Sequence, residues 1–190
     1  LVKSITAEAH RQHLLVWAHA AVFPALPNDI ADAGVDVISH ACLLGYQFSD
    51  PPLATNEDKT PVDVSRVSHA GAAMSTLLDN IHQHGIILDA TVYVYVSGET
   101  PSSSCSGNLS SQLARMAFQA GIPISAGTDD DPDWRDADSA LDRELELLVT
   151  KVGLTPAEAL RSATVIGARA AGQENEAGSI AAGKLANFVV

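Results

Sequence analysis

The stretch "AGVDVISHA", residues 33–41, decides the fold class of this chain. Gly34 closes a short helix signal over residues 28–34, because glycine readily takes the left-handed conformation that follows many helix ends. A short apolar run rich in β-branched residues comes next and ends in a polar residue, His40. A helix signal that leads directly into an apolar strand is the repeating unit of a parallel α/β sheet.

The same order of helix and strand recurs along the chain. The longest helix pattern covers residues 63–84, where apolar side chains recur at spacings of three and four. Thr155, Pro156 and Glu158 form a capping box that starts the last large helix. We therefore predict an α/β fold built on a parallel sheet. The predicted strands are residues 14–18, 35–39, 86–96 and 122–126.

The bulk composition narrows the classes of function. Hydrophobic residues make up 46% of the 190 residues, so the chain can form a packed core. The formal net charge of −12 argues against nucleic acid or an anionic membrane as a partner, because both require a basic surface. No apolar run is long enough to span a bilayer. The two cysteines predict no disulfide framework, and we expect Cys42 to be a small buried apolar residue.

Three of the four predicted strands end in a potential metal ligand. The first apolar run ends at His19, the second at His40 and the last at Asp129. In parallel βα folds the functional site forms at the carboxyl ends of the strands, so these three side chains should converge. Imidazole and carboxylate groups are the ligands of hydrolytic metal sites. The sequence thus predicts a metal site made by His19, His40 and Asp129.

The His-x-His in "IHQHGIILDA", residues 81–90, is a different case. His82 and His84 precede a strand, so they should lie at the opposite end of the sheet from the predicted site. Two residues apart on a helix, their side chains point roughly 200° apart around its axis and cannot easily bind one ion. We interpret both as surface residues near a helix C-terminus, which favours imidazolium.

Four segments of the chain carry a resemblance to a known family: "AHRQHLLVWAHA" (9–20), "AGVDVISHA" (33–41), "AGIPISAGTDDDP" (120–132) and residues 144–190. Together they resemble the metal-dependent amidohydrolase superfamily, in particular its imidazolonepropionase-like and prolidase-like members. The segment 144–190 is the most specific, since it is similar to the closing helix of that family followed by a return to a small β-sandwich.

The resemblance implies the C-terminal half of a (β/α)8 TIM barrel. Residues 1–177 would supply strands 5 to 8, and residues 178–190 would be a strand of a composite β-sandwich domain. His19 would end strand 5, His40 strand 6 and Asp129 strand 8, around one or two divalent ions, with zinc as the expected metal. The N-terminal half of the barrel would come from residues upstream of Leu1. The family's strand-1 His-x-His and strand-4 lysine are absent, so we expect this chain alone to be inactive.

The resemblance also implies an activity. We expect a metal-dependent hydrolase that cleaves the C–N bond of an amide, a cyclic amide or a dipeptide, with Asp129 moving the proton. A small-molecule substrate would meet loop residues after the strands. We expect a cytoplasmic location, with any signal sequence upstream of Leu1, and a homo-oligomer stays open. The candidates for substrate contact are Tyr93, Tyr95, Trp134 and Arg135.

Two other functions fit the same residues. An aminoheterocycle deaminase of the same superfamily would share this ligand set, although no Glu lies close to His40 to supply the acid that a deaminase needs. A non-catalytic βα scaffold would use the polar residues at its strand ends only to satisfy hydrogen bonds. Metal content separates the scaffold from the two enzymes.

Overall fold

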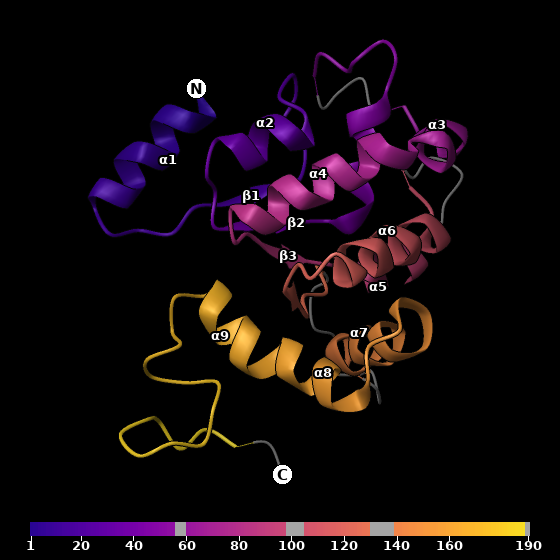
Figure 1. Cartoon of the computed structure of the whole chain (residues 1–190). Coiled ribbons are helices and arrows are strands. Elements are labelled where there is room, and N and C mark those ends of the chain that lie inside the picture. Colours follow the sequence, from indigo (N-terminus) through magenta and orange to yellow (C-terminus); the bar gives the residue numbers. More distant parts are fainter. Residues whose placement is uncertain (56–59, 98–104, 130–138, 189–190) are drawn as a thin grey trace.

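Four short strands form a single parallel sheet in the order β1-β2-β3-β4, of which Figure 1 labels the first three. The computed structural model describes residues 1–55, 60–97, 105–129 and 139–188. Helices connect the strands, so the predicted α/β class is confirmed. The strands are β1 (Trp17–His19), β2 (Val37–Ser39), β3 (Ile87–Asp89) and β4 (Ile124–Ser125).

Helices lie on both sides of this sheet. Figure 1 shows α2 and α4 above it and the segment from α8 to α9 below it. The α-helices are α1 (Val2–Arg11), α2 (Pro27–Asp32), α3 (Val64–His69), α4 (Gly71–Gln83), α5 (Val92–Ser97), α6 (Gly107–Gln119), α7 (Ala140–Leu147), α8 (Pro156–Arg161) and α9 (Gly167–Ala170). A 3₁₀ segment, η1 (Ala41–Phe48), and two π-helical turns, η3 (Leu148–Val152) and η4 (Ser162–Ile166), complete the described helices.

The two faces of the sheet differ in what covers them. Ile38 and Leu88 are paired in register and belong to the main hydrophobic core. Side chains alternate between faces along a strand, so Val37 and Ile87, one residue earlier, point the other way. There they form a second, small cluster with Ala170 of α9. The sheet is thus buried on both faces at the level of these residues.

The second face becomes polar toward the carboxyl ends of the strands. Ser39 and Asp89 are paired in register two residues beyond Val37 and Ile87, and both are buried. Ser39 and Asp89 lie on the same face of the sheet as the small apolar cluster. The cluster therefore lies next to them, toward the amino ends of the strands. The polar groups of this face are therefore concentrated at one edge of the sheet.

The predicted strand over residues 86–96 is wrong beyond Asp89. Strand β3 ends there, and residues 92–97 form helix α5 instead. Thr91 has a φ of 47°, a left-handed conformation that turns the chain out of the sheet. The alternating β-branched and aromatic residues of "TVYVYV" favour a strand locally, but the segment packs against α6 and α7 as a helix instead.

The predicted helix over residues 63–84 is divided in two. Helix α3 ends at His69 and α4 begins at Gly71, whose φ of 43° is accessible mainly to glycine. The apolar positions Val67 and Met74 remain buried on either side of the break. The spacing of apolar residues continues across the break because both helices pack on the same hydrophobic core.

Two further predictions concern single residues. The capping box of Thr155 and Glu158 is confirmed, with reciprocal hydrogen bonds between the two residues. Cys42 is buried, as predicted. Cys42 and Cys105 form one disulfide, with Cα atoms 6.2 Å apart, a pairing that the expectation of no disulfide framework did not include. The two cysteines are 63 positions apart in the sequence, so no local pattern predicts that they lie close together.

The C-terminal residues 178–188 form turns and irregular chain. None of the described residues 178–188 belongs to a strand, although the Leu185 amide donates a hydrogen bond to the Glu176 carbonyl at 2.8 Å. The assignment of residues 178–190 to a β-sandwich domain therefore stays a prediction. Within the described ranges, no helix combines the length and the apolar character that crossing a membrane requires.

Candidate functional site

The carboxyl edge of the sheet brings the predicted ligands together. His19 is the last residue of β1 and is paired with Ser39, so His40 lies one step beyond it. The His19 and His40 rings are in edge-to-face contact, with centroids 4.7 Å apart. Nε2 of His40 lies 3.8 Å from Oδ2 of Asp129, which follows β4. His40 thus contacts both of the other predicted ligands.

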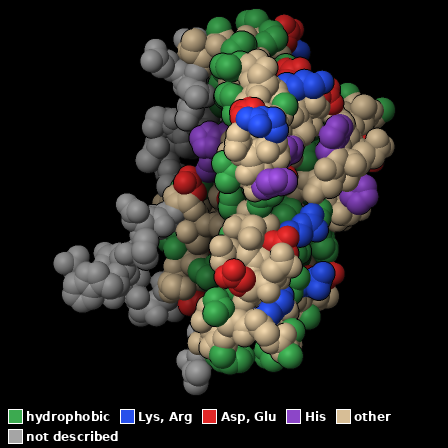
Figure 2. All heavy atoms as spheres, turned by 90° about the vertical axis from the view of Figure 1, so that its left-hand side faces the viewer, with side chains coloured by type: hydrophobic (Ala, Val, Ile, Leu, Met, Phe, Trp, Pro, Cys, Tyr) green, Lys and Arg blue, Asp and Glu red, His purple; other side chains and the backbone are tan. Residues whose placement is uncertain are grey.

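Burial distinguishes His40 from the other histidines. Figure 2 shows histidine side chains spread over the surface on the side of the molecule that carries α1 and β1. Six of the seven histidines are exposed, whereas only 7% of the surface of His40 is accessible. Nδ1 of His40 is hydrogen-bonded to Oγ1 of Thr91 at 2.9 Å. A fixed partner on one ring nitrogen orients the ring and sets the direction of the other nitrogen.

Backbone strain is concentrated at the same edge. Among the described residues other than glycine, four have a positive φ, and three of them are His40 (70°), Thr91 (47°) and Asp129 (51°). Such conformations cost about 1–3 kcal/mol each and persist where the surrounding structure enforces them, characteristically at functional sites. These three residues follow three different strands, so chance placement is a poor explanation of their proximity.

The donor groups at this edge suit a divalent metal ion. Two imidazoles and a carboxylate form the mixed N/O ligand set that zinc and related ions prefer. Among the described residues, no group of three or more His, Cys, Asp or Glu side chains is already arranged to hold an ion. His40 nevertheless lies against both His19 and Asp129, and the hydroxyl of Thr91 is hydrogen-bonded to its other ring nitrogen, as an outer partner of a ligating histidine would be.

Asp89 is a residue of this edge that the sequence interpretation missed. The indole Nε1 of Trp17 donates to Ser39 Oγ at 2.6 Å, and Ser39 Oγ donates to Asp89 Oδ2 at 3.0 Å. Oδ1 of Asp89 is buried without a hydrogen-bond partner among the described residues. Burial raises the pKa of Asp89 to about 6, the Ser39 hydroxyl lowers it, and the charge of Asp129 raises it further.

Asp89 also constrains the strand beside it. Its carboxylate lies directly against the backbone at Gly127, where a Cβ atom would collide with it. The signal that could have identified Asp89 is its position as the last residue of an apolar run, "IILD", just as His19 and His40 end theirs.

Glu144 is the second missed residue, and it comes from α7. It is fully buried, and both of its carboxylate oxygens accept backbone hydrogen bonds from the start of α5. The Val92 amide donates to Oε1 at 3.2 Å and the Tyr93 amide donates to Oε2 at 2.7 Å. Burial raises the pKa of Glu144 to about 7, against the lowering effect of these two amides, and the nearby Asp89 raises it as well.

The raised pKa of Glu144 predicts a loss of stability as the pH rises. Between its ordinary value and about 7, the folded state binds more protons at Glu144 than the unfolded state does, so the free energy of unfolding falls with pH. The full effect is on the order of 3 kcal/mol. We expect Glu144→Gln to flatten the dependence between pH 5 and 8 in urea titrations, with a smaller slope left by Asp89. An unchanged slope in the variant would contradict the assignment.

The predicted substrate contacts have different outcomes. Tyr95 lies at the site, with its ring 6.1 Å from that of His40 and edge-to-face. Burial raises the pKa of its hydroxyl, as do the charge of Asp129 and the proximity of Tyr46, so the phenol stays protonated. Tyr93 meets α7 through its backbone amide. Trp134 and Arg135 lie outside the described residues.

His82 and His84 lie away from this edge, as the sequence predicted. Both are exposed at the end of α4, and each ring is hydrogen-bonded to a backbone carbonyl, His82 to that of Gly121 at 3.1 Å and His84 to that of Asn80 at 3.0 Å. These contacts match the surface role inferred from their place before a strand.

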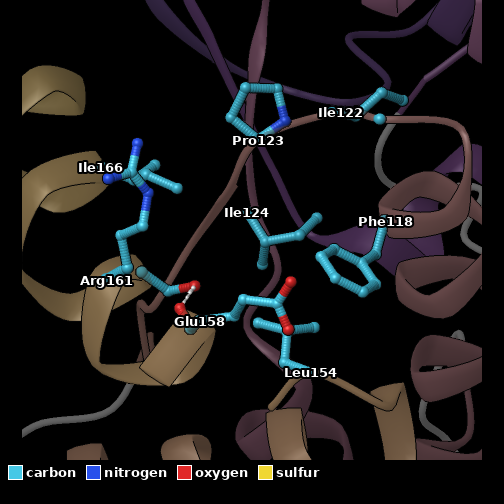
Figure 3. A pocket seen from close by; sticks show the side chains of 10 residues that line it. Phe118, Ile122, Pro123, Ile124, Leu154, Glu158, Arg161 and Ile166 are labelled. Carbon is cyan, nitrogen blue, oxygen red and sulfur yellow. Dashed lines mark hydrogen bonds between the residues drawn. The ribbon is translucent and has the colours of Figure 1, made fainter. Parts of the chain in front are cut away.

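A pocket of about 190 Å³ lies elsewhere, at the side of β4 (Figure 3). Its walls include Phe118, Ile124 and Leu154, and Arg161 and Glu158 of α8 border it. The Glu158 carboxylate already caps its own helix through Thr155. The residues that line this pocket do not include His40, Thr91 or Asp129, the three strained residues at the carboxyl ends of the strands. The pocket is therefore separate from the candidate site.

The sequence of the whole chain agrees with one protein family. The profile of the amidohydrolase family matches residues 1–190. This chain belongs to the amidohydrolase family. An imidazolonepropionase from Symbiobacterium thermophilum is 36% identical over 100 residues, which cover 53% of this chain and 23% of that protein.

Solved structures of similar fold support the architecture of this amidohydrolase chain. A Xaa-Pro dipeptidase with bound methionine has a TM-score of 0.64 at 20% identity, and a putative prolidase from Bifidobacterium longum has 0.58 at 27%. Both matches cover 97% of this chain, but only 40% and 42% of those structures. The predicted fold class, part of a (β/α)8 barrel, is confirmed, and the chain spans less than half of the structures it matches.

Proposed function

We propose that the protein containing this amidohydrolase chain is a metal-dependent hydrolase that cleaves the C–N bond of an amide, a cyclic amide or a dipeptide. The observation that carries this proposal is the convergence of His19, His40 and Asp129 at one sheet edge, with two of the three in strained backbone conformations. Strain held at a cluster of metal-binding side chains indicates a site kept for chemistry.

His19 and His40 would hold the ion, with Asp129 beside them. A divalent ion, with zinc as the expected one, would lower the pKa of a water molecule and polarise the scissile carbonyl. The hydrogen bond to Thr91 fixes the His40 ring before any ion arrives. Asp129 is 57% exposed at its side chain, so it can reach both solvent and substrate. It would take the proton of the attacking water and return it to the leaving nitrogen.

The substrate class rests on the relatives and on Tyr95. The names of the relatives point to an imidazolone ring and to Xaa-Pro dipeptides, which contain a cyclic or an ordinary amide. The Tyr95 ring lies edge-to-face with that of His40 and its hydroxyl stays protonated, so this hydroxyl would be the donor to a substrate carbonyl oxygen. An amide carbonyl suits this donor better than the amino group of a heterocycle does.

We further propose that the remaining strands of the barrel, and the other ligands, are supplied by polypeptide outside residues 1–190. The structural relatives are more than twice as long as the part that this chain matches. Strands β1 and β4 are the outermost strands of the sheet, and each has one neighbouring strand among the described residues. Closing such edges into a barrel removes unpaired backbone groups that favour aggregation.

Metal analysis combined with a substrate screen tests the proposed function. We expect the full-length protein to bind one or two equivalents of zinc or a similar ion, and to hydrolyse amides or dipeptides rather than aminoheterocycles. A double variant, His82→Ala with His84→Ala, should keep the same metal content because both residues lie away from the site. Absence of stoichiometric metal after reconstitution would leave a scaffold protein, and release of ammonia from aminoheterocycles alone would indicate a deaminase.

A further inference from the structure

Glu144 has no part in the chemistry described above, yet it is a fully buried carboxyl group close to the site. Burying a carboxylate is unfavourable, and two hydrogen bonds from backbone amides of the described residues offset this cost. Both bonds go to the first turn of α5, a helix of six residues. An acidic side chain at such a helix start is favourable, but a surface residue could provide the same cap without burial.

Thr91, the residue immediately before α5, explains why the carboxylate that binds the first turn of α5 is buried. Thr91 is β-branched, 1% exposed and held at a φ of 47°, a conformation that such residues rarely adopt. A residue stays in such a conformation only when its neighbours enforce it. The next two backbone amides, those of Val92 and Tyr93, are the ones that Glu144 binds.

Thr91 in turn contacts the His40 ring through its hydroxyl. Tyr95, one turn further along α5, lies edge-to-face with the same ring. The orientation of α5 therefore determines two contacts of His40 at once. Helix α7, which carries Glu144, contacts α5 and is the first described helix after Asp129.

We propose that Glu144 is a positioning residue for the metal site: by clamping the first turn of α5, it holds Thr91 in its strained conformation and so fixes the ring of His40. This inference rests on the proposed function only in taking His40 as a metal ligand. Glu144 itself touches neither metal nor substrate. Its effect passes through Thr91 to His40.

Glu144→Gln is the sharpest test, because the amide keeps the size of the side chain but replaces one of its two acceptor oxygens with a donor. Glu146→Gln is the matched control, since Glu146 lies two residues away on α7, is exposed and is ion-paired with Arg143 at 3.0 Å. Glu144→Asp is a second variant that keeps the charge but is too short to reach both amides. All three belong in the full-length protein at pH 8.

Two readouts separate positioning from a merely structural role. The first is the ¹⁵N chemical shifts of the His40 ring in metal-free protein, and the second is the affinity for Zn²⁺ measured by competition with a chelator. We expect Glu144→Gln to change the His40 shifts and to weaken Zn²⁺ binding about 10-fold, the lower end of the range for outer-shell partners. Glu146→Gln should change neither, and Thr91→Val should remove the sensitivity of Zn²⁺ affinity to Glu144→Gln.

The outcomes distinguish the two proposals. Folded Glu144 variants with unchanged His40 shifts and Zn²⁺ affinity would overturn the positioning role. A protein that binds no Zn²⁺ at all would refute the proposed function, and the His40 shifts would then decide the positioning role alone. A lower melting temperature without any change at His40 would mean that Glu144 only stabilises the fold.

Discussion

Replacing Asp129 by Asn is expected to lower kcat by about 10²–10⁴-fold, the range for loss of a positioned general acid–base group. The amide cannot take a proton from the attacking water at neutral pH. The fold should remain intact for two reasons. The side chain is 57% exposed, and asparagine tolerates the left-handed backbone that Asp129 adopts at a φ of 51°.

Steady-state kinetics on an amide substrate of the full-length protein, with the melting temperature measured alongside, check this prediction. Asp79→Asn provides the control, because Asp79 is an exposed acid on α4, the helix whose C-terminal end precedes β3. If Asp129→Asn keeps more than a tenth of the kcat of the unmodified protein, the proton-transfer role of Asp129 is wrong.

Alanine at His40 and at His19 should both abolish tight metal binding, but with different effects on stability. His40 is buried and bonded to Thr91, so its removal leaves a cavity and an unpaired buried hydroxyl, a loss of about 1–3 kcal/mol for the hydroxyl alone. His19 is exposed at its strand end, so His19→Ala should leave the melting temperature of the metal-free protein almost unchanged. Metal affinity should fall in both variants by more than the 10–100-fold typical of an outer-shell residue.

Elemental analysis after dialysis and thermal unfolding of the metal-free proteins distinguish these effects. His84→Ala serves as the reference, since its ring is exposed and hydrogen-bonded to the Asn80 carbonyl near the end of α4. Full metal content in His19→Ala would remove this residue from the ligand set. Equal destabilisation by His19→Ala and His40→Ala would contradict the burial argument.

The parts of the site that follow from a local rule were predictable. His19, His40 and Asp129 each end or follow an apolar run, and parallel strands place such ends at one edge. The rule uses only the order of helix and strand along the chain. It identifies which side chains meet without any knowledge of their distances.

Asp89 obeys the same rule but was missed, because its strand was expected to continue to residue 96. The segment after Asp89 alternates Val and Tyr, which is typical of a strand, and local propensity carried the prediction past the true end. The turn at Thr91 depends on a left-handed backbone at a β-branched residue, which no local pattern indicates.

Glu144 was beyond the reach of any local pattern. Its partners are backbone amides 51 and 52 positions away. Almost every residue has a backbone amide, so the sequence does not indicate which of them Glu144 binds. On a helix that also carries Arg143 and Glu146, it resembles one more solvated charge. Only the packing of α7 against α5 makes it a buried clamp.

The contact between Asp89 and Gly127 has a consequence for how this protein can diverge. Gly127 has no positive φ that would demand glycine, so the requirement for glycine comes from the carboxylate pressed against it. A side chain added at position 127 would displace the Asp89 carboxylate, so we expect such a mutation to be tolerated best together with a smaller residue at position 89. The two positions, 38 residues apart in the sequence, are therefore expected to be coupled in one direction: descendants with a larger residue at 127 should also have lost the acid at 89, whereas a change at 89 alone leaves Gly127 free to remain.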